Sequence, residues 1–400
     1  MFKPSRLSVL FAGLCALILS LGVARYSFTP MIPAMAEQVG VDSSLAGWLA
    51  GWNYMGYLTG LFIVWLVSDL RAKDFFYRYG LVVAVIATAL MAAHDNRLIW
   101  YVSRYFAGIA TAAGFMLGTG LVMNWLHHNN HEGEMGLHFS GVGLGIIFSA
   151  IVVDITGLDS WLGLNWRLQW VALAIVGIAL LIPATFLLPR PKEREVEMAR
   201  EGDMLLKVDP PSAKWLLLLQ AAYFCAGFSN TLNVTFTSLI TELQPIPGFG
   251  AKVWMLVGIA AAVAPYLWDR LARYMGPLDA LRVAFSVNIL ANLTLAMTTS
   301  TATTMLASVL FGFSFMGIVS LTLSTVGRLY GTKATQVMAK LTLGYCIAQI
   351  LSPIMSGIIA QATGSFTLPL WIVSGLMLVG LGCLMALRGE GAETRVIHSR

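Results

Sequence analysis

Two arginines stand far inside long apolar stretches of the sequence. Arg25 lies about 27 Å of helix beyond Leu7, and Arg104 lies about 10 Å beyond the start of another stretch. A charge at such a depth is costly and commonly faces a binding site or a wet cavity. A guanidinium binds carboxylates and similar anions through paired hydrogen bonds. We therefore expect Arg25 and Arg104 to contact an anionic ligand at one level; the alternative is that each is locked in a structural pair or caps backbone carbonyls.

Two titratable groups accompany these arginines. Asp154 is the one acid well inside an apolar stretch, and we expect it near the level of Arg25 and Arg104. There its carboxylate would form an ion pair with one of the arginines. During a working cycle the ion pair would break and the carboxylate would take up a proton. The alternative is that Asp154 meets water at the outer interface. His138 could titrate near neutral pH at the inner mouth, or it could be a satisfied histidine at a helix end.

One apolar stretch, residues 214–241, has an unusually polar face. Asn230, Asn233, Thr237 and Thr241 fall at i, i+3, i+7 and i+11, so they share one side of a helix. Such a face lines a cavity or hydrogen-bonds to a neighbouring helix. The residues expected to bind a ligand are Arg25, Tyr26, Arg104, Tyr223, Asn230, Asn233, Thr237, Tyr345 and Gln349.

The elements that must position these residues are twelve apolar stretches. Hydrophobic residues make up 58% of the 400-residue chain and charged residues only 11%, which excludes an ordinary water-soluble domain. A bilayer core needs about 20 apolar residues per helix, and lipid cannot satisfy a bare backbone amide. We predict an all-α membrane protein whose helices cover 7–36, 44–67, 75–93, 97–126, 134–157, 166–188, 214–241, 251–268, 278–297, 302–327, 334–360 and 367–387.

A charged segment divides the stretches into two sets of six. The predicted units are a six-helix bundle over 1–188, a cytoplasmic linker over 189–213, a second bundle over 214–387 and a cytoplasmic tail over 388–400. With both termini inside, the loops outside hold only Arg97, Arg167 and Lys252 among the basic residues. The pI near 9.0 therefore reflects topology and gives no reason to expect nucleic acid.

Several motifs resemble those of the major facilitator superfamily. After the second and eighth stretches an acid is followed by basic residues: Asp69 precedes Arg71, and Asp269 precedes Arg270. The segment from Arg104 to Gly108 matches that family's Arg-x-x-x-Gly motif, and residues 163–170 before the sixth stretch fit as well. The resemblance implies two pseudo-repeated six-helix bundles and gating by Asp69, Arg71, Asp269 and Arg270. The first turn departs from the family pattern because it lacks the glycine that normally follows the acid.

Other residues resemble a narrower branch, the YbfB/YjiJ-type transporters. These are Gly22-Val-Ala-Arg25-Tyr26, then Thr29-Pro30 and Pro33, and later Ser352-Pro353 through Thr363-Gly364-Ser365-Phe366. The resemblance implies a secondary transporter that works by alternating access.

The two arginines favour a small anionic molecule as the cargo of this transporter, and we expect a proton gradient, or else a substrate gradient, to drive it. The distribution of basic residues predicts that both termini are cytoplasmic, and we expect a monomer in a bacterial inner membrane. The resemblance does not imply a particular cargo. An aromatic or amphiphilic cargo would equally suit the aromatic residues near the second stretch, although Trp and Tyr also favour the membrane interface; these residues are Trp48, Trp52, Tyr54 and Tyr57.

Two other classes of protein compete with a transporter. One is a membrane sensor or scaffold that keeps the fold without turnover, which is consistent with the scarcity of acids. The other is a membrane enzyme, which would need a cluster of His, Asp or Glu at one membrane face. The sequence contains no Gly-x-x-x-x-Gly-Lys-Ser/Thr loop, Gly-x-Ser-x-Gly elbow, CxxC pair or HExxH motif. We therefore expect no enzyme activity, no cofactor and no metal site.

Overall fold

The computed structural model describes residues 5–67, 69–93, 95–129, 135–157, 160–191, 212–243, 248–297, 300–330 and 334–387. Within these ranges the regular structure is helical. In chain order the helices are α1 (Arg6–Leu17), η1 (Ile18–Tyr26, π-helical), α2 (Phe28–Val39), α3 (Ser43–Leu66), α4 (Leu70–Ala93), α5 (Arg97–Ala112), η2 (Ala113–Leu117, π-helical), α6 (Gly118–His128), α7 (Met135–Thr156), α8 (Trp166–Phe186), α10 (Ala213–Glu242), α11 (Gly250–Met275), α12 (Pro277–Met297), α13 (Thr301–Tyr330), α14 (Ala334–Thr363) and α15 (Thr367–Ala386).

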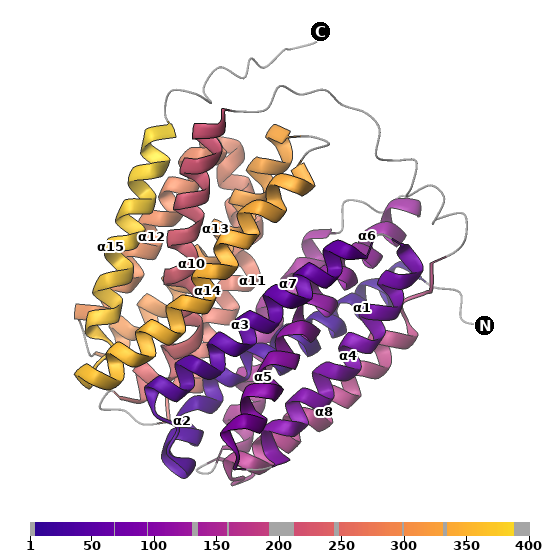
Figure 1. The fold of residues 1–400 in the computed structure, drawn as a ribbon, viewed down its shortest axis with the longest axis vertical. Helices are drawn as coiled ribbons and strands as arrows, with labels where there is room; N and C mark the ends of the chain where they lie inside the picture. Colours follow the sequence, from indigo (N-terminus) through magenta and orange to yellow (C-terminus); the bar gives the residue numbers. More distant parts are fainter. Residues whose placement is uncertain are drawn as a thin grey trace.

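The helices gather into two groups that lean against each other (Figure 1). We call α1 to α8 the first lobe and α10 to α15 the second lobe. The closest packing between the lobes joins α7 to α11 and α3 to α14, and α2 also packs on α10. The predicted linker and tail fall largely outside the described residues, namely at 192–211 and 388–400.

Nine of the described helical segments are long and apolar enough to cross a membrane. The rod formed by α1, η1 and α2 is one of them, and the described part of α7 is a shorter apolar helix, Ser140–Thr156. Helix α10 is outside that set although it has 30 residues. Its asparagines, serines and threonines lower the mean hydropathy, and these side chains are buried in the protein, away from its outer surface. An all-helical membrane protein is confirmed.

The helix ends follow from their local sequence. Asp42 accepts a hydrogen bond from the amide of Leu45 (2.7 Å) and so caps α3, and Asn165 caps α8 in the same way through Leu168 (3.0 Å). Gly40 ends α2 with a φ of 67°, in the left-handed region that favours glycine. These caps fix where each rod enters and leaves the predicted bilayer.

The seam between α3 and α14 depends on direct backbone contact. A Cβ placed on Gly47 would lie 2.2 Å from the carbonyl oxygen of Pro353, and one on Gly357 would lie 2.3 Å from that of Ser43. Small residues of this kind let two helices approach closely in a membrane. A larger side chain at either glycine would separate α3 from α14 and open the seam.

An uncharged polar network joins helices inside the second lobe. Asn292 donates to Ser229 Oγ (2.7 Å), Asn233 donates to Asn292 (2.7 Å), and Asn288 donates to Ser314 Oγ (3.0 Å). All of these side chains are buried. Buried amides are stable in lipid only when they are hydrogen-bonded. The asparagines therefore attach α12 to α10 and α13, and the polar helix α10 is satisfied by its neighbours.

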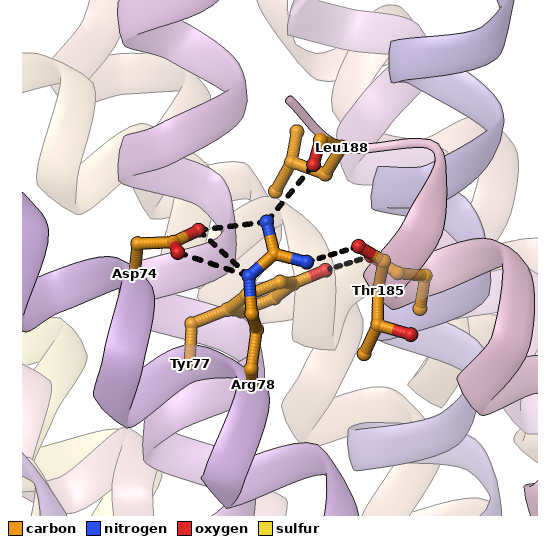
Figure 2. Close-up of polar contacts among 6 residues, drawn as sticks. Asp74, Tyr77, Arg78, Thr185 and Leu188 are labelled. Atoms are coloured by element: carbon orange, nitrogen blue, oxygen red, sulfur yellow. Dashed lines mark hydrogen bonds and ion pairs between the residues drawn. The ribbon is translucent and has the colours of Figure 1, made fainter. Parts of the chain in front are cut away.

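Two arginine clamps attach helix ends within the lobes. In the first lobe, Arg78 of α4 binds both carboxylate oxygens of Asp74 and donates to the carbonyls of Thr185 and Leu188 (2.9 Å for Leu188) at the end of α8 (Figure 2). The last carbonyls of a helix lack partners and carry partial negative charge, so a cation there is favourable. The hydroxyl of Tyr77 adds a hydrogen bond to Ala184 O (2.9 Å).

The second lobe repeats this clamp with different residues. Arg282 of α12 binds Asp279 and donates to Leu384 O at the end of α15 (2.8 Å). In each lobe the clamp joins the third long helix of that lobe to its last one. The repetition of one device at matching places supports an internal duplication of the chain.

We predict that Arg78→Met destabilises the protein by about 3 kcal/mol, because it leaves the carboxylate of Asp74 buried without its partner. The measurement is the thermal unfolding midpoint of the purified protein in detergent. Arg273→Met is the matched control: its Asp269 partner is also four residues away, but both side chains are largely exposed, so the loss should stay below about 1 kcal/mol. Equal effects of the two substitutions would contradict the role given to the clamp.

Candidate functional site

The segment that carries Arg25 has an irregular backbone. η1 spans nine residues in π-helical form, and the amide of Ser27 bonds to Gly22 O (2.8 Å), five residues back. π-Helical turns widen a helix and often occur at functional sites. The segment is packed tightly from behind, because a Cβ on Gly22 would lie 2.6 Å from Gly145 O of α7. The π-helical backbone of η1 and its packing on α7 therefore fix the position of Arg25.

Side chains of α5 satisfy backbone carbonyls of η1. Arg104 donates to Ala24 O (2.9 Å) and to Arg25 O (3.3 Å), and Thr111 donates to Ser20 O (2.9 Å). The guanidinium of Arg104 also lies 4.6 Å from the ring of Phe28, and its side chain is buried. The structure thus places Arg104 against backbone carbonyls, which is the alternative that the sequence left open. Ligand contact by Arg104 stays a prediction.

Arg25 is surrounded by aromatic rings. Its Cζ lies 4.5 Å from the ring centroid of Tyr54, 4.8 Å from that of Tyr57 and 5.6 Å from that of Tyr26. The side chain is 7% exposed, and its Nε has no hydrogen-bond partner. Among the residues that the structure describes, no carboxylate forms an ion pair with Arg25. The result is a buried cation that is stabilised by rings and by no counter-charge.

The second lobe presents an aromatic and amide surface to this cation. Tyr223 and Tyr345 stack with centroids 4.4 Å apart, and Asn230 donates to the hydroxyl of Tyr345 (3.1 Å). Tyr345 and Tyr223 belong to the same buried cluster as Tyr26. Cys346, which follows Tyr345, packs with Tyr57 beside Arg25. The structure therefore brings together five of the residues expected to bind a ligand, which are Arg25, Tyr26, Tyr223, Asn230 and Tyr345.

A second contact crosses between the lobes beside Arg25. The ring of Tyr26 meets that of Trp254 of α11 edge-on, with centroids 6.1 Å apart. Tyr57 of α3 packs in one small cluster with Cys346 of α14 and Ala112 of α5. The hydroxyl of Thr29 donates to Val234 O of α10. The candidate site is thus built from both lobes at the place where they meet.

Three of the expected ligand contacts have other surroundings. Asn233 is engaged in the polar network of the second lobe, and Thr237 donates to Asn233 O (2.6 Å) within its own helix. Gln349 lies one helical turn beyond Tyr345 on α14 and is buried. The polar face of α10 was expected either to line a cavity or to hydrogen-bond to a neighbouring helix. Asn233 and Thr237 are hydrogen-bonded to protein groups. Their contact with a ligand stays a prediction.

Asp154 and His138 lie apart from Arg25. Gly22 and Gly145 mark one level of η1 and α7, so Asp154 lies about 9 Å farther along its helix than Arg25 does on its own. Among the described residues Asp154 forms no ion pair with Arg25 or Arg104, and its role in proton coupling stays a prediction. His138 is wholly buried against Gly13 and bonds to Thr119 Oγ1 (3.0 Å), so it is not at an open mouth.

The residues expected to gate the molecule lie at helix ends. Asp69 accepts a hydrogen bond from the amide of Ala72 (3.0 Å) and caps α4. Asp269 pairs with Arg273 one turn later on α11, while Arg71 and Arg270 are exposed. Their role in gating stays a prediction.

Trp254 was not expected at the site, and the sequence indicated Tyr54 and Tyr57 only as members of an aromatic group that could suit an aromatic cargo. Tyr54 and Tyr57 are three residues apart, so they share a helix face, and that spacing was the signal available in the sequence. Trp254 gave no such signal, because only the packing of α11 against η1 shows that it meets Tyr26.

Comparison with known proteins places the chain in a family. The model of the family described as "Uncharacterised MFS-type transporter YbfB" matches residues 17–386. The probable sulfoacetate transporter SauU of Cupriavidus necator is 24% identical over 94% of this chain and 91% of its own length. The putative transporter AraJ of Escherichia coli K12 is 21% identical over 69% of this chain and 68% of its own length.

Solved structures show the same fold. The nucleoside transporter NupG superposes with a TM-score of 0.73 at 13% identity, over 96% of this chain and 99% of that one. The human organic anion transporter MFSD10 does so with a TM-score of 0.65 at 16% identity, over 96% and 100%. The matched family model spans almost the whole sequence and the fold agrees with it, so the chain is a membrane transporter of the major facilitator superfamily, in the YbfB-type family.

Proposed function

We propose that this chain is a secondary transporter that moves a small organic anion across the membrane by alternating access. The observation that carries the proposal is Arg25, a buried cation at the meeting of the two lobes with no carboxylate partner among the described residues. Burying a lone charge costs several kcal/mol, so such a group persists where a ligand can neutralise it. The relative SauU is named for an organic anion, which agrees with this choice of cargo.

The proposal includes a duplicated architecture. Twelve membrane-spanning helices would form two six-helix bundles, over 1–188 and 214–387, with the linker 189–213 and the tail 388–400 in the cytoplasm. The paired arginine clamps, Arg78 with Asp74 and Arg282 with Asp279, support the duplication. The inner membrane of a bacterium and a monomeric state belong to the same proposal.

Alternating access requires that contacts between the lobes break and form again. The uncharged seams of α3 with α14 and of α7 with α11 suit this task, since they hold by packing of small residues. The helix-end groups Asp69, Arg71, Asp269 and Arg270 are proposed to gate the movement of the lobes.

We predict that Arg25→Gln lowers transport about 10- to 100-fold, because charge-assisted hydrogen bonds to the anion are lost. The measurement is uptake of labelled carboxylates and sulfonates into proteoliposomes. Arg97→Gln is the control, since Arg97 is an exposed arginine at the start of α5.

Two outcomes would contradict the proposal. Undiminished uptake by the Arg25→Gln protein would remove Arg25 from the site. Absence of flux for every solute, under every gradient, would favour the alternative function, a sensor or scaffold with a transporter fold.

Proton coupling is the second part of the proposal, with Asp154 as the acid and His138 as the further candidate. We predict that Asp154→Asn abolishes accumulation driven by a pH gradient while exchange of labelled for unlabelled anion continues, because only the coupled step needs a titrating acid. Glu37→Gln is the control, because Glu37 is an exposed acid at the outer end of α2. Unchanged pH-driven accumulation in the Asp154→Asn protein would exclude Asp154 as the coupling group.

A further inference from the structure

We infer that the cargo is an organic monoanion with a flat, uncharged body, and that it binds with its charged head on the first lobe and its body on the second lobe. The inference rests on the proposed function and adds the substrate class and the orientation. It comes from the unequal distribution of charge and aromatic surface across the site.

The first lobe supplies one buried positive charge without a counter-ion among the described residues. The ring centroids of Tyr54 and Tyr57 lie 4.5 and 4.8 Å from Arg25 Cζ. Nε of the same guanidinium has no hydrogen-bond partner. An anion would therefore approach the hydrogen-bonding edge of the group that includes Nε. The guanidinium of Arg104 does not serve as a second cation for the ligand, because it donates hydrogen bonds to Ala24 O and Arg25 O.

The second lobe supplies no charge near the site. α10 has no charged residue between Lys214 and Glu242, and α11 has none between Lys252 and Asp269. α14 has none from Leu341 to its end at Thr363. A second negative charge on the ligand, or a positive one, would be buried there without a partner. This excludes dianions, zwitterions and cations as preferred cargo.

The same lobe presents aromatic surface and neutral polar groups. The Tyr223 and Tyr345 rings stack 4.4 Å apart at an angle of 23°, and Asn230 fixes the Tyr345 hydroxyl. Trp254 is fully buried, yet its Nε1 has no partner, whereas Nε1 of Trp268 donates to Phe313 O (2.8 Å). Ring faces favour a flat body, and an unpartnered N–H suits a neutral acceptor on it.

The test compares four probes on the purified full-length chain, by thermal shift and by the affinities derived from it. Benzenesulfonate has the head and the ring, and methanesulfonate has the head alone. 4-Sulfobenzoate has the ring with two charges, and benzyl alcohol has the ring without a charge. We expect benzenesulfonate to bind best and 4-sulfobenzoate to bind at least about tenfold more weakly, because its second charge has no partner.

Two variants test separately how the protein binds the charged head and the flat body of the ligand. Arg25→Gln should weaken benzenesulfonate and methanesulfonate alike, by at least about tenfold. Tyr223→Leu should leave methanesulfonate unchanged and weaken benzenesulfonate about three- to tenfold, because only the ring loses a partner. Tyr274→Leu is the matched control, since Tyr274 is 89% exposed.

Several results would overturn the inference. These are tighter binding of 4-sulfobenzoate than of benzenesulfonate, equal binding of the two monoanions, a Tyr223→Leu effect that is the same for both, or no shift with any of the four probes. The proposed function fails separately, through absence of flux for every solute in proteoliposomes. A chain that transports another class of solute would therefore refute the substrate class and keep the transporter.

Discussion

The placement of one buried guanidinium constrains the centre of this molecule. Arg25 is surrounded by Tyr26, Tyr54 and Tyr57, and no described carboxylate pairs with it. Rings stabilise a cation by only about 0.5–2 kcal/mol each, less than the cost of removing it from water. The rings therefore compensate the charge of Arg25 only in part, and under the proposed function an anionic ligand would supply the missing negative charge.

The irregular backbone around Arg25 is stable because another helix compensates for it. A π-helical segment leaves carbonyls poorly satisfied, and in lipid nothing but protein can satisfy them. Arg104 and Thr111, seven residues apart on α5, do so for Ser20, Ala24 and Arg25. The Arg-x-x-x-Gly segment is thus a support for the site: its arginine bonds to η1, and a Cβ on Gly108 would lie 2.0 Å from Asn53 O of α3.

The sequence predicted the bounds of the helices better than it predicted the contacts between their side chains. Length and hydropathy located each long rod to within a few residues, except that α4 begins at Leu70 and α11 runs on to Met275. Depth along a helix predicted that Arg25 would be buried, because a charge deep in an apolar stretch must face protein or water. The same argument left the partner of Asp154 open, because depth along a helix gives the level of a residue in the membrane but not the direction in which its side chain points. Nor could spacing show the partners of Asn233, which depend on how α10 packs on α12.

The uncharged character of the second lobe completes the physical argument. Its polar network is built from amides and hydroxyls, each bonded to another, so it holds α10, α12 and α13 together with no net charge. If that lobe carried an acid opposite Arg25, the two lobes would be joined by a buried ion pair whose rupture costs several kcal/mol. With the cation on one side only, the lobes can separate without breaking such a pair. Under the proposed function, the charge of the ligand would then be the strong electrostatic link between the lobes.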